Sequence, residues 1–241
     1  MTEYLFVLST GLVAGAVSGV IGTGSSIMLL PVLVLVFGPK QAIPIMAVAA
    51  VMANAARVMA WWRGVDWRAV AAYSIPGAPA AALGAQTLLV LPSQVIEITL
   101  GLFFLAMIPA RRRLQRAQYR LRTWQLALAG AVIGFLTGIV LSTGPLSVPA
   151  FLAYGLSKGA FLSTEAASSL MLFVSKAVAF RGLGALPGDT ILQGVIVGTS
   201  LMAGTFLGKR AVLRMSAATH YRLLDAVMMC AGVTLLWTGL R

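Results

Sequence analysis

Long apolar stretches separated by short polar segments occupy nearly the whole chain. An apolar–polar alternation with a period of two residues is missing, so the stretches predict helices and not the strands of a barrel. A hydrocarbon core about 30 Å thick takes roughly 20 helical residues to cross. We therefore expect an all-α integral membrane protein with eight to ten hydrophobic segments. The apolar runs are 4–21, 27–37, 42–62, 69–91, 95–110, 123–141, 146–154, 160–180, 191–207 and 218–240.

The runs form two sets of five, and the second run of each set is too short to cross a membrane alone. Gly15 matches Gly134 and Pro31 matches Pro149, within an offset that stays between 117 and 120 residues. Such self-similarity indicates an internal duplication. The expected organisation is a first membrane repeat at 1–110, a basic cytoplasmic linker at 111–122 and a second membrane repeat at 123–241.

Composition supports this assignment and changes how the charge is interpreted. The chain is 59% hydrophobic and only 10% charged, too little charge to cover the surface of a soluble domain. Its net charge of +12 would suggest a nucleic-acid partner in a soluble protein. In a membrane protein, lysines and arginines gather in cytoplasmic loops, so we expect a lipid bilayer and no nucleic acid as partner.

The distribution of basic residues predicts the orientation of the repeats. If the loop Arg111–Arg122 is cytoplasmic, thirteen basic residues lie inside and four outside. This bias favours repeats of inverted topology, with both termini outside a multi-pass protein of the inner membrane. Whether the short runs re-enter or span stays open, and the count depends on it.

Two stretches rich in glycine and hydroxyl side chains, 19–33 and 138–152, interrupt the apolar pattern. Irregular backbone at membrane depth occurs only inside protein or beside a water-filled cavity. A helix that begins there directs free N–H groups and its positive dipole end at a bound anion. We expect both breaks to contribute to one anion site, although close packing of small residues is the competing interpretation. The expected ligands are Gly22, Thr23, Gly24, Ser25, Ser26, Ser142, Thr143, Gly144 and Ser147.

Ionisable residues inside apolar runs are rare and usually functional. Arg57 and Lys176 occupy nearly equivalent places in the two repeats, and Asn54 lies one turn before Arg57. Because cationic side chains bind oxyanions, these three residues are predicted substrate ligands. The alternative is that the long side chains of the two cations extend to the membrane–water interface. Glu165 is the candidate for proton coupling. No nucleophile–base pair, cofactor fingerprint or metal-binding pattern is found, so we expect neither an enzyme nor a cofactor.

Three segments carry a family resemblance: "GLVAGAVSGVIGTGSSIMLLPVLV" near the start, "RGVDW" at Arg63–Trp67, and "GAVIGFLTGIVLSTGPLSVP" in the second repeat. With the two-repeat plan, they make the chain similar to the sulfite exporter TauE/SafE family of membrane permeases. That family's first turn is usually richer in glycine, where this chain has Thr23, Ser25 and Ser26. The resemblance implies an inner-membrane carrier for sulfite, thiosulfate or organosulfonates.

The function expected from these features is secondary transport of small sulfur-containing anions by alternating access, with a proton or another ion as a candidate coupling partner. An anion channel with the same cationic lining is one alternative. A membrane scaffold subunit without transport is another. The sequence does not indicate the oligomeric state.

Overall fold

The computed structural model describes residues 2–21, 25–116, 120–140, 144–156, 158–211 and 217–240. Over these residues the chain forms ten α-helices and one short 3₁₀ helix, without strands, which confirms the predicted all-α fold. The elements are α1 (Thr2–Ile21), α2 (Ser25–Phe37), α3 (Pro39–Trp61), η1 (Trp62–Gly64), α4 (Trp67–Val90), α5 (Ser93–Arg116), α6 (Thr123–Val140), α7 (Gly144–Ala153), α8 (Lys158–Gly182), α9 (Gly188–Ala211) and α10 (Ala217–Gly239).

Helix ends are marked by residues suited to them. Gly38 follows α2 with φ 74° and Gly155 follows α7 with φ 103°, a backbone region that glycine adopts without steric cost. Pro39 then opens α3, where its missing N–H would have no helical partner. At the start of α4, the Asp66 carboxylate accepts a hydrogen bond of 3.1 Å from the N–H of Ala69.

The expected linker at 111–122 begins inside a helix, because α5 continues to Arg116. The apolar run ends near Ala110, but arginine, leucine and glutamine are good helix formers, so the helix extends past the apolar region. Arg113, Arg120 and Arg122 are exposed. The end of α5 therefore carries the basic segment into a polar environment.

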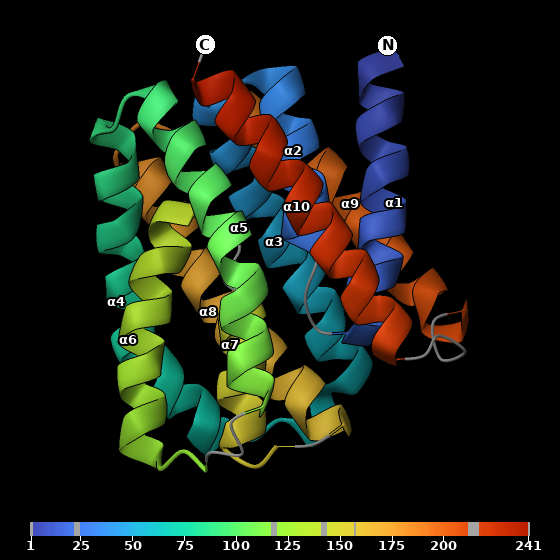
Figure 1. The fold of residues 1–241 in the computed structure, drawn as a ribbon, viewed down its shortest axis with the longest axis vertical. Coiled ribbons are helices and arrows are strands. Elements are labelled where there is room, and N and C mark those ends of the chain that lie inside the picture. Colours follow the sequence, from blue (N-terminus) through green and yellow to red (C-terminus); the bar gives the residue numbers. More distant parts are fainter. Residues whose placement is uncertain are drawn as a thin grey trace.

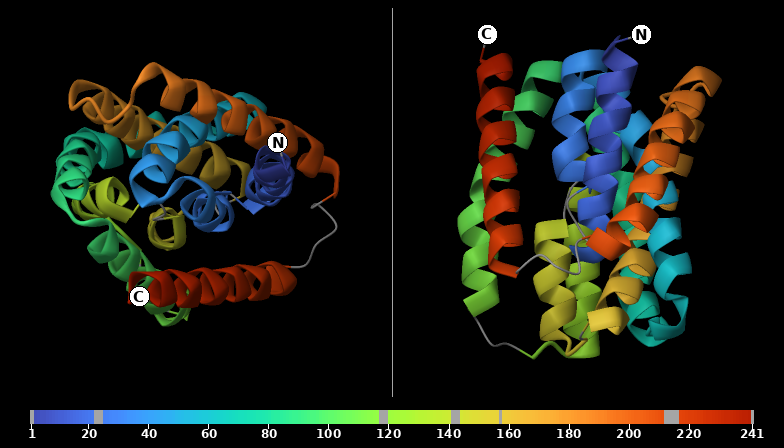
Figure 2. Two further views of the ribbon diagram at one scale, coloured as in Figure 1. Left: turned by 90° about the horizontal axis from the view of Figure 1, so that it is seen from above. Right: turned by 90° about the vertical axis from the view of Figure 1, so that its right-hand side faces the viewer.

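The two short helices each turn back toward the end of the bundle where their hairpin began. Helix α1 starts at the end of the molecule where α10 finishes, and α2 returns to that same end (Figures 1 and 2). At the opposite end, the N–H of Leu121, just before α6, donates a 2.8 Å hydrogen bond to the carbonyl of Ala153, the last residue of α7. Hence α1–α2 and α6–α7 are hairpins that enter the bundle from opposite ends.

Helix contacts link the two halves of the chain extensively. Helix α1 packs on α9 and α6 packs on α4, while α3 contacts α8 near the centre. Helices α5 and α10 pack together on one side of the molecule (Figure 2). Each of these contacts joins a helix of the first half to one of the second half.

Glycines allow the closest helix crossings. A Cβ on Gly134 of α6 would collide with the carbonyl oxygen of Gly77 in α4, and a Cβ on Gly77 would lie 2.9 Å from the Gly130 carbonyl oxygen. On the other side, a Cβ on Gly15 of α1 would collide with the Leu201 carbonyl of α9. These positions therefore support the small-residue packing interpretation for the glycines that precede each break.

Large apolar side chains cover much of the outer surface, as expected for helices that contact lipid. Phe6, Leu102, Val178 and Leu192 are all more than half exposed. Among the described residues, three helical segments are long and apolar enough to cross a membrane: Lys40–Gly64, Ser93–Ala110 and Gly188–Leu207. These three segments are candidate membrane spans by their length and composition.

Candidate functional site

A buried ion pair joins the two halves of the molecule. Arg57 on α3 donates from Nη1 to Oε2 of Glu165 on α8 over 2.9 Å, and the two residues are only 4% and 2% exposed. Burial this deep removes both groups from water, so each charge depends on its partner for stabilisation. Removing either member would leave an uncompensated charge inside the protein.

The guanidinium of Arg57 is held in place by Asn54, one turn earlier on α3. Nη2 of Arg57 donates to Oδ1 of Asn54. The Asn54 amide group is itself fixed, because its Nδ2 donates to the carbonyl of Ala50 over 2.7 Å. The backbone of α3 therefore orients the amide so that its oxygen faces the cation.

The second carboxylate oxygen of Glu165 is bound by hydroxyl groups. Oε1 accepts a 3.1 Å hydrogen bond from Ser147 on α7 and a 2.8 Å bond from Ser169, one turn further along α8. Ser168, three residues after Glu165 on α8, is fully buried, and among the described atoms its Oγ has no hydrogen-bond partner. The short helix α7 thus brings the Ser147 hydroxyl to the ion pair.

Lys176 lies away from this cluster. It follows Glu165 by eleven residues on α8, about 16 Å along the helix axis. Its Nζ is fully buried and donates to the carbonyl oxygens of Thr137 and Gly138, over 2.8 and 2.6 Å, in the last turn of α6. A cation at a helix C-terminus is stabilised by the free carbonyls and the helix dipole. Lys176 therefore binds helix-end carbonyls, whereas Arg57 binds a carboxylate.

The predicted ligands are therefore divided by the structure. Asn54, Arg57, Ser147 and Glu165 come together, while Lys176 does not join them. Ser25 and Ser26 are buried in the first turn of α2, and Gly144 begins α7. Gly22, Thr23, Gly24, Ser142 and Thr143 lie outside the described residues.

Sequence reasoning missed one member of the cluster, Ser169. A signal for Ser169 was present, because it follows Glu165 by four residues and so shares its helix face. Burial of the unpartnered Ser168 hydroxyl depends on how α8 packs against its neighbours, which spacing alone does not reveal.

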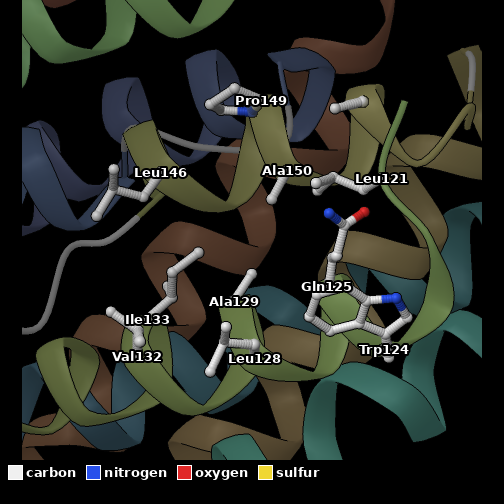
Figure 3. A pocket seen from close by; sticks show the side chains of 11 residues that line it. Leu121, Trp124, Gln125, Leu128, Ala129, Val132, Ile133, Leu146, Pro149 and Ala150 are labelled. Carbon is white, nitrogen blue, oxygen red and sulfur yellow. The ribbon is translucent and has the colours of Figure 1, made fainter. Parts of the chain in front are cut away.

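A separate cavity of about 500 Å³ lies against the α6–α7 hairpin (Figure 3). Leu146, Pro149 and Ala150 of α7 face it, together with apolar residues of α6 and the side chains of Trp124 and Gln125. The neighbouring Ser147 instead bonds Glu165, so α7 presents an apolar face to this cavity and a hydroxyl to the ion pair. An anion finds no cationic side chain among the residues lining this cavity.

Comparison with known proteins gives one assignment. Searches of curated proteins and of solved structures returned no significant match. The family model described as "Sulfite exporter TauE/SafE" matches residues 7–235, nearly the entire chain. Members of this family are membrane transporters and not enzymes. The chain therefore belongs to the sulfite exporter TauE/SafE family.

Proposed function

We propose that this protein is a secondary transporter that moves small sulfur-containing anions, such as sulfite, thiosulfate or organosulfonates, across the inner membrane. The observation that carries the proposal is the buried cation Arg57, held by Asn54 and Glu165 where α3 meets α8. A guanidinium is a permanently charged hydrogen-bond donor to oxyanions, which suits sulfite and sulfonate groups.

In this proposal the anion binds at Arg57, with donors supplied by α7. Ser147 already reaches the cluster from the start of α7. We propose the buried hydroxyl of Ser168, three residues after Glu165 on α8, as a further donor. The break residues Gly22–Gly24 and Ser142–Thr143 remain proposed ligands through their N–H and hydroxyl groups. Lys176 is assigned a different task, which is to stabilise the end of α6 beside the second break.

We further propose that the chain is built of two repeats of inverted topology. The opposite entry of the two hairpins supports this, since α1–α2 and α6–α7 start from opposite ends of the bundle. The contacts support it too, because the packing of α1 on α9 has its counterpart in the packing of α6 on α4. Opposed rocking of such repeats would expose Arg57 to each side in turn.

The test is uptake of a labelled anion panel into proteoliposomes: sulfite, thiosulfate, methanesulfonate, sulfate and chloride. A carrier saturates, and its uptake accelerates when the same anion is trapped inside. A channel gives neither saturation at low concentration nor counterflow, and a scaffold gives no flux. Saturable counterflow of a sulfur anion is the expected result.

Substitution of Arg57 assigns the site. Arg57→Gln should reduce flux about 10- to 100-fold, because hydrogen bonds to a charged group contribute about 1.5–3 kcal/mol. Glu165 would then lack its cation, so the double variant Arg57→Gln/Glu165→Gln is measured beside it to separate loss of binding from loss of folding. Arg68→Gln is the matched control, since Arg68 is exposed at the start of α4. Full flux in folded Arg57→Gln protein would refute the assignment.

A further inference from the structure

We propose that the Glu165 carboxylate occupies the place on Arg57 that the transported anion takes, and that one proton enters with each anion and binds Glu165. This inference depends on the proposed function. It names the coupling ion, a proton, and the charge class of the substrate, a monovalent oxyanion.

The two oxygens of Glu165 have separate tasks. Oε2 bonds Arg57 over 2.9 Å, whereas Oε1 accepts from the hydroxyls of Ser147 and Ser169. A proton on Oε2 abolishes the attraction to Arg57 and leaves Oε1 held by its two donors. Nη1 of Arg57 then donates to an oxygen of the anion in place of Oε2, while Nη2 keeps its bond to Asn54.

Charge balance couples the two events. The buried pair is neutral when Glu165 is ionised and the site is empty, and neutral again when Glu165 is protonated and a monoanion binds Arg57. An anion bound beside ionised Glu165 would leave one net negative charge, and a proton without an anion would leave one net positive charge. Isolated buried charges are strongly unfavourable, so both intermediate states are poorly populated.

The same argument selects among substrates. A dianion such as sulfate would leave one net negative charge at the pair even with Glu165 protonated. Thiosulfate is also a dianion, so this inference narrows the substrates of the proposed function to its monovalent members. A monoanion such as hydrogensulfite or a sulfonate restores neutrality. We therefore expect preference for monovalent oxyanions.

Few other titratable groups face Glu165 among the described residues. On α3 it meets Arg57, and the buried Tyr73 lies on α4, which packs against α8. Asp66 is near the preceding residue, because its N–H donates a 2.9 Å bond to Oγ1 of Thr164, but its carboxylate caps α4. From α7 the contact is the Ser147 hydroxyl. The guanidinium is thus the one charged group bonded directly to Glu165 in this part of the chain.

The proton balance is simple. A proton from water on one side forms the O–H bond on Oε2, and the ion pair with Arg57 separates as the anion binds. On the other side the anion leaves, the proton returns to water, and the ion pair forms again. No covalent bond other than this O–H bond changes.

The experiment uses the full-length protein in proteoliposomes, with labelled methanesulfonate as probe and a pH-sensitive dye inside. Methanesulfonate stays a monoanion across the pH range used, so any pH dependence belongs to the protein. We expect one proton to enter per anion and a pH gradient of one unit to concentrate the anion about tenfold, because one unit corresponds to about 1.4 kcal/mol. The accumulation should not change with membrane potential, since the cargo is neutral overall.

Glu165→Gln mimics the protonated carboxyl and cannot titrate. This variant should retain methanesulfonate counterflow but lose proton entry and the tenfold accumulation. Asp189→Asn is the matched control, an exposed carboxylate at the start of α9, and should behave as the parent protein.

The outcomes separate the two proposals. Counterflow in the parent protein without proton entry would overturn the coupling and leave the carrier intact. Proton-coupled accumulation by Glu165→Gln, or loss of counterflow in folded Glu165→Gln protein, would overturn the role of Glu165. Equal accumulation of sulfate and methanesulfonate would overturn the charge selection. Absence of any anion counterflow in folded parent protein would refute the proposed function itself.

Discussion

The ion pair between Arg57 and Glu165 makes a quantitative prediction about stability. Arg57→Gln leaves the Glu165 carboxylate buried with two hydroxyl donors and no cation. Breaking a buried ion pair from one side costs about 3–5 kcal/mol. Glu165→Gln should cost less, about 2–3 kcal/mol, because Asn54 still accepts from Arg57 and the glutamine oxygen can accept as well.

These free energies convert to measurable shifts. For a chain of this size, 1 kcal/mol corresponds to about 2–4 °C in Tm, so Arg57→Gln should lower Tm by about 6–20 °C. The double variant removes both charges and leaves no lone ion. The free energy of unfolding that the double variant loses should be smaller than the sum of the two single losses by at least about 1.5 kcal/mol. Such non-additivity is expected because the two groups are in direct contact.

The assay is thermal unfolding of purified protein in one detergent, with all variants at equal concentration. Arg68→Gln and Asp189→Asn, alone and together, form the control cycle at exposed sites. The same measurement with methanesulfonate adds a second readout, because a ligand that binds the native state raises Tm. The rise should be larger for Glu165→Gln, in which Arg57 has no carboxylate competitor. The ion-pair argument would be refuted if the stability losses of the two single variants add up to the loss of the double variant. It would also be refuted if these losses equal those of the control cycle.

Three further substitutions test how the structure supports the site. Lys176→Met should lower Tm by about 3–10 °C, because two buried carbonyls at the end of α6 lose a charged donor. The affinity for methanesulfonate, measured by calorimetry, should change less than about twofold. A large loss of that affinity would place Lys176 in the site. Gly77→Leu should destabilise the protein by about 1–3 kcal/mol or more, because the added side chain forces α4 away from α6. Gly182→Leu is the control and should not destabilise the protein, because an added Cβ there meets nothing within 4 Å. Equal melting curves for the two variants would contradict the close crossing of α4 and α6. Asn54→Ala should raise KM about five- to tenfold while counterflow is retained, because the Arg57 guanidinium loses the hydrogen bond that orients it. An unchanged KM would exclude this positioning role of Asn54.

Much of the fold follows from the lengths of the apolar runs and from the glycine, proline and hydroxyl residues between them. Each apolar run became one helix, and α1 and α6 end at Ile21 and Val140, next to the clusters of glycine and hydroxyl residues. Helix α5 continues past its apolar run to Arg116, because apolarity marks the membrane region whereas helix propensity extends further. The local sequence pattern indicates the environment of a helix more accurately than it indicates the residue at which the helix ends.

The site was only partly accessible to sequence reasoning. Arg57, Glu165 and Asn54 stood out as polar residues in apolar runs, and that signal needs no tertiary information. Their pairing could not be predicted, because Arg57 and Glu165 are 108 positions apart and meet only through the contact of α3 with α8. Equivalence in the repeats suggested one shared role for Arg57 and Lys176. The structure instead gives the first a carboxylate and the second a helix end.

The most direct test of the central claim is an experimental structure of the protein with methanesulfonate bound at acidic pH. The account predicts sulfonate oxygens within hydrogen-bond distance of Nη1 of Arg57, and Oε2 of Glu165 withdrawn from its present separation of 2.9 Å. Methanesulfonate bound elsewhere, with the Arg57–Glu165 ion pair intact, would contradict it.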